Sequence, residues 1–359
     1  MTYRINGIQH LGLGSDSFIE NWKWLRTHFG FDVPMFDSVA EAELMKYYTE
    51  NTVVNKRAAM ILNLQGGCPV ELIELRSRKP VQPAFEIRLG DLGIFAGKIK
   101  IDPAKLEKAK NKFDGLNMSV PLSKQPHGGL SGFLTYGNGV HFQLIEGDRS
   151  FTKGPHETNG IAGCIIGCRS IEESKSYYAL FGYDHVLYEG EGIYDDFKGL
   201  PGGEKHLRRC LLGKSVPQTG GFAALAGETF IELVQMTEDT PRNMYEGRIW
   251  GDVGFVHLGM DVRGMGEIEK MLSSKGYPFK CDSSNGLHMG QTRVHCTYVE
   301  DPNGILIELI EVYKIPIMEK WNLFLNVEKR APEKPLPNWM LKAMRFSRIK
   351  DDYWTKKNI

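Results

Sequence analysis

The fold of this chain is decided by the stretch VEDPNGILIEL, which covers residues 299–309. Its Asp-Pro-Asn-Gly segment is turn chemistry, and the apolar run that follows is typical of a strand with Glu308 in its middle. Three earlier apolar strands follow turns in the same way. They read VELIE at 70–74, FQLIE at 142–146 and IELV at 231–234. The sequence therefore contains four copies of one marked strand.

Each marked strand closes a unit that begins with a short alternating strand and a helix. A glycine lies just past each expected helix and is followed by an apolar residue, a pattern typical of a left-handed C-cap. The expected first strands lie at 8–13, 95–101, 161–168 and 255–262, the helices at 18–29, 104–113, 171–181 and 268–275, and the glycines are Gly30, Gly115, Gly182 and Gly276. The repeated unit is strand, helix, and a meander that ends in the marked strand.

The four units indicate an ancestral pair that was doubled, because the distance from first strand to marked strand alternates between long and short. We therefore predict an α+β fold in which four βαβββ units form two paired, curved, mixed sheets. The predicted domains are residues 1–151 and 158–313, with two units each. Residues 314–359 are predicted to form an extended and helical tail, with a helix that starts near Asn338 and runs to about Ile349.

Composition excludes several classes of protein. The chain has 359 residues, with 44 Lys and Arg against 44 Asp and Glu, which argues against a nucleic-acid partner. It lacks an apolar run long enough to span a membrane, and the polar N-terminus lacks a signal core, so we expect a cytoplasmic protein. The tail carries 11 basic and five acidic residues, so the neutral sum combines an acidic body with a basic tail. A monomer and a homodimer both fit the sequence.

The four-unit arrangement resembles the vicinal oxygen chelate superfamily, which includes glyoxalase I, the bleomycin-resistance proteins and the extradiol dioxygenases. The resemblance covers about residues 5–313 and depends on the four marked strands. It implies that two units combine into one curved sheet whose concave face binds a divalent metal. In this superfamily the ligands come from a histidine position on the first strand and a glutamate position on the last strand of each unit. Strands lie ~4.8 Å apart, so four inward side chains can meet at one ion.

Carried over to this chain, the ligand pattern is complete in the first and last units. The first unit offers His10 and Glu71, and the fourth offers His257 and Glu308. The two middle units are incomplete, with Ala96 or Gly97 and Gln143 in the second and Gly163 and Glu232 in the third.

Two pairings of the units remain open. If consecutive units pair, as in the extradiol dioxygenases, the ligand set is Glu232, His257 and Glu308, which lacks the first histidine of the iron enzymes. If units one and four pair, as in single-chain four-unit glyoxalases, the set is His10, Glu71, His257 and Glu308. We favour the second pairing because it confines the losses to units two and three.

The resemblance implies a metal-dependent enzyme with a small-molecule substrate. The first hypothesis is a glyoxalase-I-like lyase or isomerase that forms a metal-stabilised enediolate, with Glu71 or Glu308 as the base. The second is an Fe(II) dioxygenase of the extradiol or hydroxyphenylpyruvate type. The third is a non-catalytic binding protein of the bleomycin-resistance kind. Imidazole and carboxylate ligands suit Zn, Ni, Mn, Co or Fe, so the metal itself stays open.

Two further segments bear on the site. His295 and Tyr298 lie on opposite faces of the strand before the 301–304 turn, so at most one of them is expected to line the site. The polar insert at 194–209 is expected to be a solvated loop, with a lid over the site as the alternative.

Overall fold

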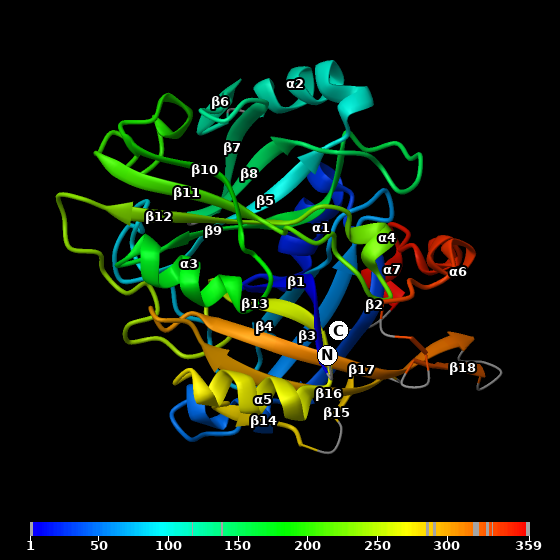
Figure 1. Ribbon diagram of the computed structural model, residues 1–359. Coiled ribbons are helices and arrows are strands. Elements are labelled where there is room, and N and C mark those ends of the chain that lie inside the picture. The colour runs from blue at the N-terminus through cyan, green and yellow to red at the C-terminus, as the bar shows by residue number, and fades with distance from the viewer. Residues whose placement is uncertain are drawn as a thin grey trace.

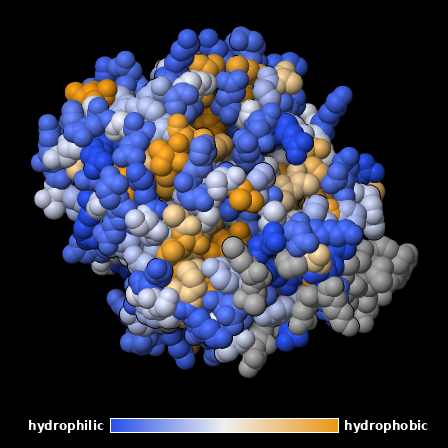
Figure 2. All heavy atoms as spheres, in the orientation of Figure 1, coloured by the Kyte–Doolittle hydropathy of each residue, from blue (hydrophilic) through white to orange (hydrophobic). Residues whose placement is uncertain are grey.

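The computed structural model describes residues 3–116, 118–137, 139–284, 287–289, 292–318, 323–327, 330–331 and 333–356. Within these residues the chain forms two mixed sheets with helices packed against them, which confirms the predicted α+β class. Figure 1 shows one sheet in the upper half of the view and the other in the lower half, with α1 between them. In the view of Figure 2 the surface is mostly hydrophilic, with apolar residues in separate patches.

The first sheet joins unit one to unit four, as the favoured pairing predicts. It has ten strands, and β1 and β13 lie side by side at its centre. In order across the sheet its strands are β14 (Cys281–Asp282), β16 (Thr292–Glu300), β17 (Leu306–Met318), β13 (Gly254–Arg263), β1 (Arg4–Gly14), β4 (Val70–Leu75), β3 (Asn55–Leu62) and β2 (Val33–Glu41), while β15 (Leu287–Met289) pairs with β16 and β18 (Leu323–Asn326) with β17.

The second sheet joins units two and three in the same way. Its eight strands are, in order, β10 (His185–Gly192), β11 (Leu207–Gly213), β12 (Phe230–Met236), β9 (Thr158–Gly167), β5 (Gly93–Ile101), β8 (Val140–Glu146), β7 (Leu130–Tyr136) and β6 (Val120–Lys124). Each sheet thus combines one unit from residues 1–151 with one from 158–313. The division of the chain into those two domains stays a prediction, and both sheets connect across it.

The two sheets share one apolar core. In β1, Leu11 and Leu13 face away from His10 and pack with Trp22 of the first helix. The side chains of the first sheet pack closely on Gly97 of β5, where an added Cβ would lie 3.0 Å from Leu11 Cδ2 and 3.1 Å from Phe255 Cζ. Because the helices and the shared core cover one face of the first sheet, the alternate side chains of its strands are left to form a site on the other face.

The four predicted helices are present as α1 (Phe18–Phe29), α2 (Leu106–Asp114), α3 (Ile171–Ala179) and α5 (Met265–Ser274). Gly30, Gly182 and Gly276 have φ of 76°, 80° and 87°, so three of the predicted left-handed glycines are confirmed. Gly115 was predicted wrongly, since its φ is −70° and the chain continues through it in a helical turn. The shorter helices are η1 (Glu43–Tyr48), η2 (Pro103–Lys105), η3 (Asp195–Phe197), α4 (Ala223–Ala226), α6 (Asn338–Ala343), η5 (Met344–Ser347) and α7 (Tyr353–Lys356). Among the described helices, none combines the length and the apolar character that a membrane span requires.

The C-terminal tail folds back onto the body of the protein. Leu336 and Leu341 are buried in a cluster with Leu62 of β3 and Leu225 of α4, and Figure 1 shows α6 and α7 beside α4. The regular helix ends at Ala343 and continues as the turn η5, short of the predicted end near Ile349. The cause is a tertiary contact, because the Ile349 amide donates to Asp32 O at 2.9 Å, which draws the chain out of the helical path.

Truncation of one buried side chain measures how firmly the tail is bound. We predict that Leu341→Ala lowers the free energy of unfolding by about 2–4 kcal/mol, because Leu341 is 1 % exposed and its removal leaves a cavity. The matched control is Phe346→Ala on the same tail, which should change it by less than about 0.5 kcal/mol because Phe346 is 80 % exposed. Urea denaturation measures both, and equal values for the two variants would show that the tail does not pack on the body.

Candidate metal centre

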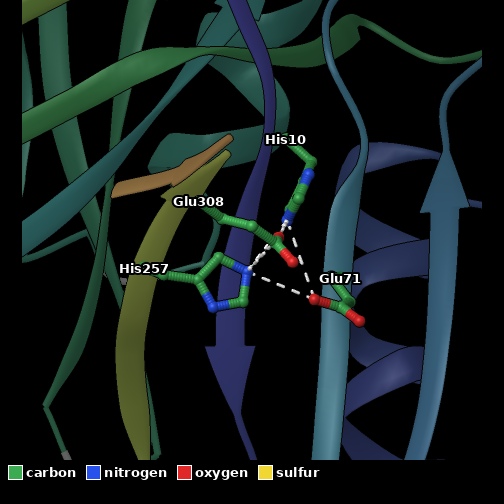
Figure 3. A group of neighbouring side chains, drawn as sticks. All are labelled: His10, Glu71, His257 and Glu308. Atoms are coloured by element: carbon green, nitrogen blue, oxygen red, sulfur yellow. Dashed lines mark hydrogen bonds and ion pairs between the residues drawn. The ribbon is translucent and has the colours of Figure 1, made fainter. Parts of the chain in front are cut away.

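The four residues of the favoured set meet at one point on the first sheet. His10 lies on β1, Glu71 on β4, His257 on β13 and Glu308 on β17, and all four are buried. Figure 3 shows the side chains pointing toward one another from these four strands. We call this group the tetrad. Each residue offers a nitrogen or a carboxylate oxygen, and these atoms all lie within 4.8 Å of one another.

The spacing of the tetrad atoms is that of ligands around a single ion. His10 Nε2 lies 2.8 Å from His257 Nε2 and 3.1 Å from Glu308 Oε2. The other nitrogen–oxygen distances are 3.2, 3.4 and 3.6 Å. Donors ~2.1 Å from a Zn²⁺-sized ion, at tetrahedral or octahedral angles, lie about 3.0–3.4 Å apart. The donor set therefore fits a divalent cation.

Two features of the tetrad fit a cation between its atoms. Glu308 Oε2 is buried and accepts no hydrogen bond from the described residues, although the two imidazole Nε2 atoms lie 3.1 and 3.4 Å from it. The two Nε2 atoms lie 2.8 Å from each other, so at most one proton fits between them. Buried carboxylates are costly unless they are paired or bind a metal. The residues present therefore fit a metal ion, and their carboxylates carry two negative charges toward it.

Two glycines make room for the histidine rings. In the register of β1 and β13, His10 lies opposite Gly259 and His257 lies opposite Gly12. A Cβ at Gly259 would lie 2.3 Å from the His10 ring, and one at Gly12 would lie 2.5 Å from the His257 ring. In both units the glutamate strand pairs its carboxylate residue with that glycine, since Gly12 is opposite Glu71 and Gly259 is opposite Glu308. The two halves of the tetrad, one from each unit, are thus built by the same local pattern.

Neighbouring side chains orient the tetrad. Tyr298 donates a 2.6 Å hydrogen bond to Glu308 Oε1, and Gln9 Oε1 lies 3.1 Å from His10 Nδ1, where it can accept the ring N–H and leave Nε2 free as a ligand. Trp250 Nε1 donates to His257 Nδ1 at 3.4 Å, and the two rings are nearly parallel, with an interplanar angle of 8°. Tyr298 reaches the site and His295 instead contacts Asp282, so only one of the two lines the site, as predicted.

Both carboxylates of the tetrad are held in the charged form. Burial raises the pKa of Glu71, but the Lys56 ammonium and a hydrogen bond from His257 outweigh it and bring the pKa to about 2. Burial also raises the pKa of Glu308, and His257 and His10 together lower it below its ordinary value. The surroundings differ, because Lys56 Nζ lies 3.9 Å from Glu71 Oε1, whereas the described ion-pair partners of Glu308 are the two histidines.

The second sheet carries a different cluster at the equivalent position. There the register places Lys98 opposite Gln143 and Gly163, so Ala96 and Gly163 occupy the histidine positions. The Lys98 ammonium contacts both Gln143 Oε1 and Glu232 Oε2. A side chain from the facing strand thus takes the space of the absent histidine.

Arg209 completes the charge balance of this second cluster. Its guanidinium contacts Glu232 Oε1 and donates to both oxygens of Asp196 at 2.9 and 2.8 Å. Two basic and two acidic side chains therefore neutralise one another. Burial raises the pKa of Glu232, but Arg209 and Lys98 outweigh it and hold the pKa at about 2. The second cluster therefore contains two cationic side chains, whereas the tetrad offers only donor atoms and negative charge.

The alternative ligand set is not brought together. Glu232 lies on β12 in the second sheet, bonded to Lys98 and Arg209, while His257 and Glu308 belong to the first. The predicted loop at 194–209 also differs from expectation, because Asp196 and Phe197 are buried and pack on Arg209. The sequence analysis missed Lys98 altogether. Its signal was the pair of lysines, Lys98 and Lys100, within the otherwise apolar run FAGKIKI, all of which is buried.

The fold defines the class of structure. The chain has the fold of a solved glyoxalase I and of a solved structure named as a dioxygenase, which is the fold that the resemblance to the vicinal oxygen chelate superfamily predicted.

Particular solved structures share this fold. A mutant of glyoxalase I from Zea mays is 14% identical, with a TM-score of 0.53 over 86% of this chain and 92% of that chain. A candidate dioxygenase from Bacillus subtilis is 13% identical, with a TM-score of 0.56 over 98% of both chains. No family model and no curated protein matches the sequence. At these identities the likeness shows the fold and does not decide the activity.

Removing one charge from the second cluster tests whether its basic and acidic side chains neutralise one another. We predict that Lys98→Met lowers the free energy of unfolding by about 3–5 kcal/mol, because it leaves Glu232 buried with one cation fewer. Adding Glu232→Gln should recover part of this loss, with a coupling energy of about 1–3 kcal/mol. Guanidinium denaturation measures each variant. Lys270→Met, at an exposed lysine on α5, is the control and should leave the midpoint unchanged; additive losses in the double variant would contradict the pairing.

Proposed function

We propose that the chain is a metal-dependent enzyme of the vicinal oxygen chelate type, a glyoxalase-I-like lyase or isomerase that removes a proton beside a carbonyl group. The observation that supports this most directly is the tetrad itself, with His10, Glu71, His257 and Glu308 buried around one point. A divalent ion bound there would act as a Lewis acid on two adjacent oxygens of the substrate. Zn, Ni, Mn, Co and Fe all suit these ligands.

The number of protein donors favours this reaction over a dioxygenase. Two histidines and one carboxylate, the set used by non-haem Fe(II) oxygenases, leave three octahedral positions, enough for a chelating substrate and O₂ together. The tetrad supplies four donors. Two adjacent substrate oxygens would bring an ion held by the tetrad to six donors and would leave it no position for O₂. The dioxygenase remains the second candidate, supported by the Bacillus subtilis structure of similar fold.

The two carboxylates are suited to different tasks. Glu71 has the Lys56 ammonium beside it, which also lies over the Trp250 ring at 4.7 Å. Glu308 is oriented through Oε1 by Tyr298, and its Oε2 faces the two histidine Nε2 atoms at 3.1 and 3.4 Å without a lysine or arginine beside it among the described residues. A general base needs an acceptor oxygen that is held in a fixed direction at the reacting centre. We therefore assign the proton-accepting role to Glu308 and a charge-balancing, ligand role to Glu71.

The surroundings of the tetrad are asymmetric along the sheet. On one side Trp250 and Tyr298 pack in an apolar cluster with Met45 of η1 and close that end. On the other side a cavity of about 390 Å³ is lined by Met60 and Ile310, among others. Met60 is the register partner of Glu71, and Ile310 follows Glu308 by two residues on the same face. A substrate therefore has room on one side of the tetrad.

Metal binding is the first test of this function. We predict that the purified protein binds one divalent ion per chain and that His257→Ala weakens binding at least ~100-fold, since even loss of an outer partner of a ligand costs 10–100-fold. Equilibrium dialysis with Zn²⁺, Ni²⁺, Mn²⁺, Co²⁺ and Fe²⁺, read by elemental mass spectrometry, measures both. His185→Ala, at an exposed histidine on β10, is the matched control. Unchanged binding in His257→Ala would place the metal elsewhere.

Proton exchange tests the chemistry. We predict that the metal-loaded protein exchanges the C–H next to the carbonyl of 2-hydroxyacetophenone with D₂O, as seen by NMR. Glu308→Gln should slow this exchange by ~10²–10⁴, because the base is lost, and Glu71→Gln should slow it less at matched metal occupancy. Oxygen uptake on catechols by the Fe²⁺ form without exchange would favour the dioxygenase. Ligand binding without either reaction would favour a binding protein.

A further inference from the structure

The cavity beside the tetrad is built from three distant parts of the chain. The sheet contributes Met60 and Ile310, the segment after β11 contributes Phe222 and Leu225 at α4, and the tail contributes residues of 336–347. The parts are joined by hydrogen bonds rather than by packing alone. Gln218 Nε2 donates to Ile8 O at 2.9 Å, and the Leu336 amide donates to Gly221 O at 2.9 Å. Hydrogen bonds between these segments thus hold the walls of the cavity in place.

The cavity lies next to the tetrad on the same face of the first sheet, although none of the four tetrad residues lines it. Gln9 lines the cavity and contacts His10 Nδ1, and Met60 lines it and pairs with Glu71 on the neighbouring strand. A molecule whose oxygens reach the tetrad from this side would place the rest of its structure in this space. Figure 1 shows the tail and α4 side by side at this edge of the protein.

The described lining of the cavity is mostly apolar and carries no positive charge. Phe36, Leu62, Val312, Leu336 and Met344 are typical of the walls. The described lining residues include no lysine, arginine or histidine, and the one carboxylate among them is Asp261, whose Oδ2 accepts from Asn6 at 2.9 Å. An anionic group in the cavity would lack a cationic partner and would face this carboxylate, so burial there would be unfavourable.

We infer that the substrate is an amphiphilic molecule, with two adjacent oxygens at one end and an uncharged aliphatic or aryl group at the other, and that the C-terminal tail forms the wall that selects this group. The inference rests on the proposed function for the oxygen end and on the cavity for the apolar end. The volume of about 390 Å³ accommodates a chain or ring well beyond a three-carbon metabolite.

The tail is held at both ends of the wall. The Leu336 amide bonds to Gly221 O before it, and after it Arg348 Nε lies 3.0 Å from Asp32 Oδ2. Between these anchors Trp339 lines the cavity while 65 % exposed, and Met35 of β2 lines it while 41 % exposed. Two exposed apolar side chains therefore form the rim, where an apolar group would enter.

Three hydroxamates test the inference, because they share one two-oxygen chelating group. Acetohydroxamate lacks an apolar chain, octanohydroxamate adds six methylenes, and suberic acid monohydroxamate ends a similar chain in a carboxylate. With Zn²⁺-loaded protein we expect calorimetry to give at least ~100-fold tighter binding for octanohydroxamate than for acetohydroxamate, since a fully buried methylene is worth about fourfold in Kd. Suberic acid monohydroxamate should lose most of that gain. Equal Kd values for the three probes would overturn the inference.

Variants of the C-terminal tail test whether it forms the wall of the cavity that selects the apolar group. Trp339→Ala should weaken octanohydroxamate binding at least ~5-fold and leave acetohydroxamate unchanged, because one wall of the apolar site is removed. Phe346→Ala is the matched control, since Phe346 is an aromatic residue of the same tail, is exposed and does not line the cavity. Ala343→Phe, which adds a ring to the lining, should exclude the octyl chain at least ~10-fold and spare acetohydroxamate. Equal effects of Trp339→Ala and Phe346→Ala would remove the tail from the proposal.

The two proposals fail separately. If Zn²⁺ does not bind at the tetrad, the proposed function is wrong. The order of hydroxamate affinities measured on metal-free protein then still shows whether the cavity binds the apolar group. If Zn²⁺ binds but chain length has no effect, the function stands and the substrate class proposed here is wrong.

Discussion

The structure of the site depends on two buried carboxylates that face each other without a lysine or arginine between them. A buried charge must be paired, protonated or bound to a metal. The second sheet shows the paired solution, in which Lys98 and Arg209 neutralise Glu232 and Asp196. The first sheet has the same strand geometry but presents two imidazoles in place of the cations. The chain thus contains one centre that is neutralised by its own lysine and arginine and a second centre in which, on the proposed function, a metal ion would supply positive charge.

Space decides which solution each sheet adopts. In the first sheet Gly12 and Gly259 lie opposite the histidines, and any side chain there would overlap the rings. In the second sheet the corresponding glycine position of the second unit is Lys98, and the histidine position it faces is Gly163. In the first sheet the glycine is on one central strand and the functional side chain is on the facing strand. In the second sheet these two positions are exchanged, so the functional side chain comes from the other strand. Both arrangements keep the central pair of strands at normal spacing.

Much of this fold could be predicted from the sequence because its signals are local and repeated. The strand marked by Glu308 recurs four times, and glycines that end three of the helices have the expected left-handed conformation. The tetrad residues were carried over from the resemblance to the vicinal oxygen chelate superfamily, at positions that the marked strands define. Lys98 could not be found in this way, because a lysine in a strand gives no sign of facing Gly163 across the sheet. The burial of Asp196 and the wall formed by the tail also depend on contacts between segments far apart in sequence.

The order of the units along the chain has a consequence for folding. Units two and three are neighbours in sequence and complete their sheet with β12, which ends at Met236. Unit one must wait for β13, which begins at Gly254, before its central strand gains the antiparallel partner that closes the first sheet. During synthesis from the N-terminus the middle of the protein can therefore become ordered before its first unit does. Contacts of such long sequence separation slow folding. The nascent chain must carry an incomplete edge on β1, with His10 and Glu71 in place, until the last unit arrives.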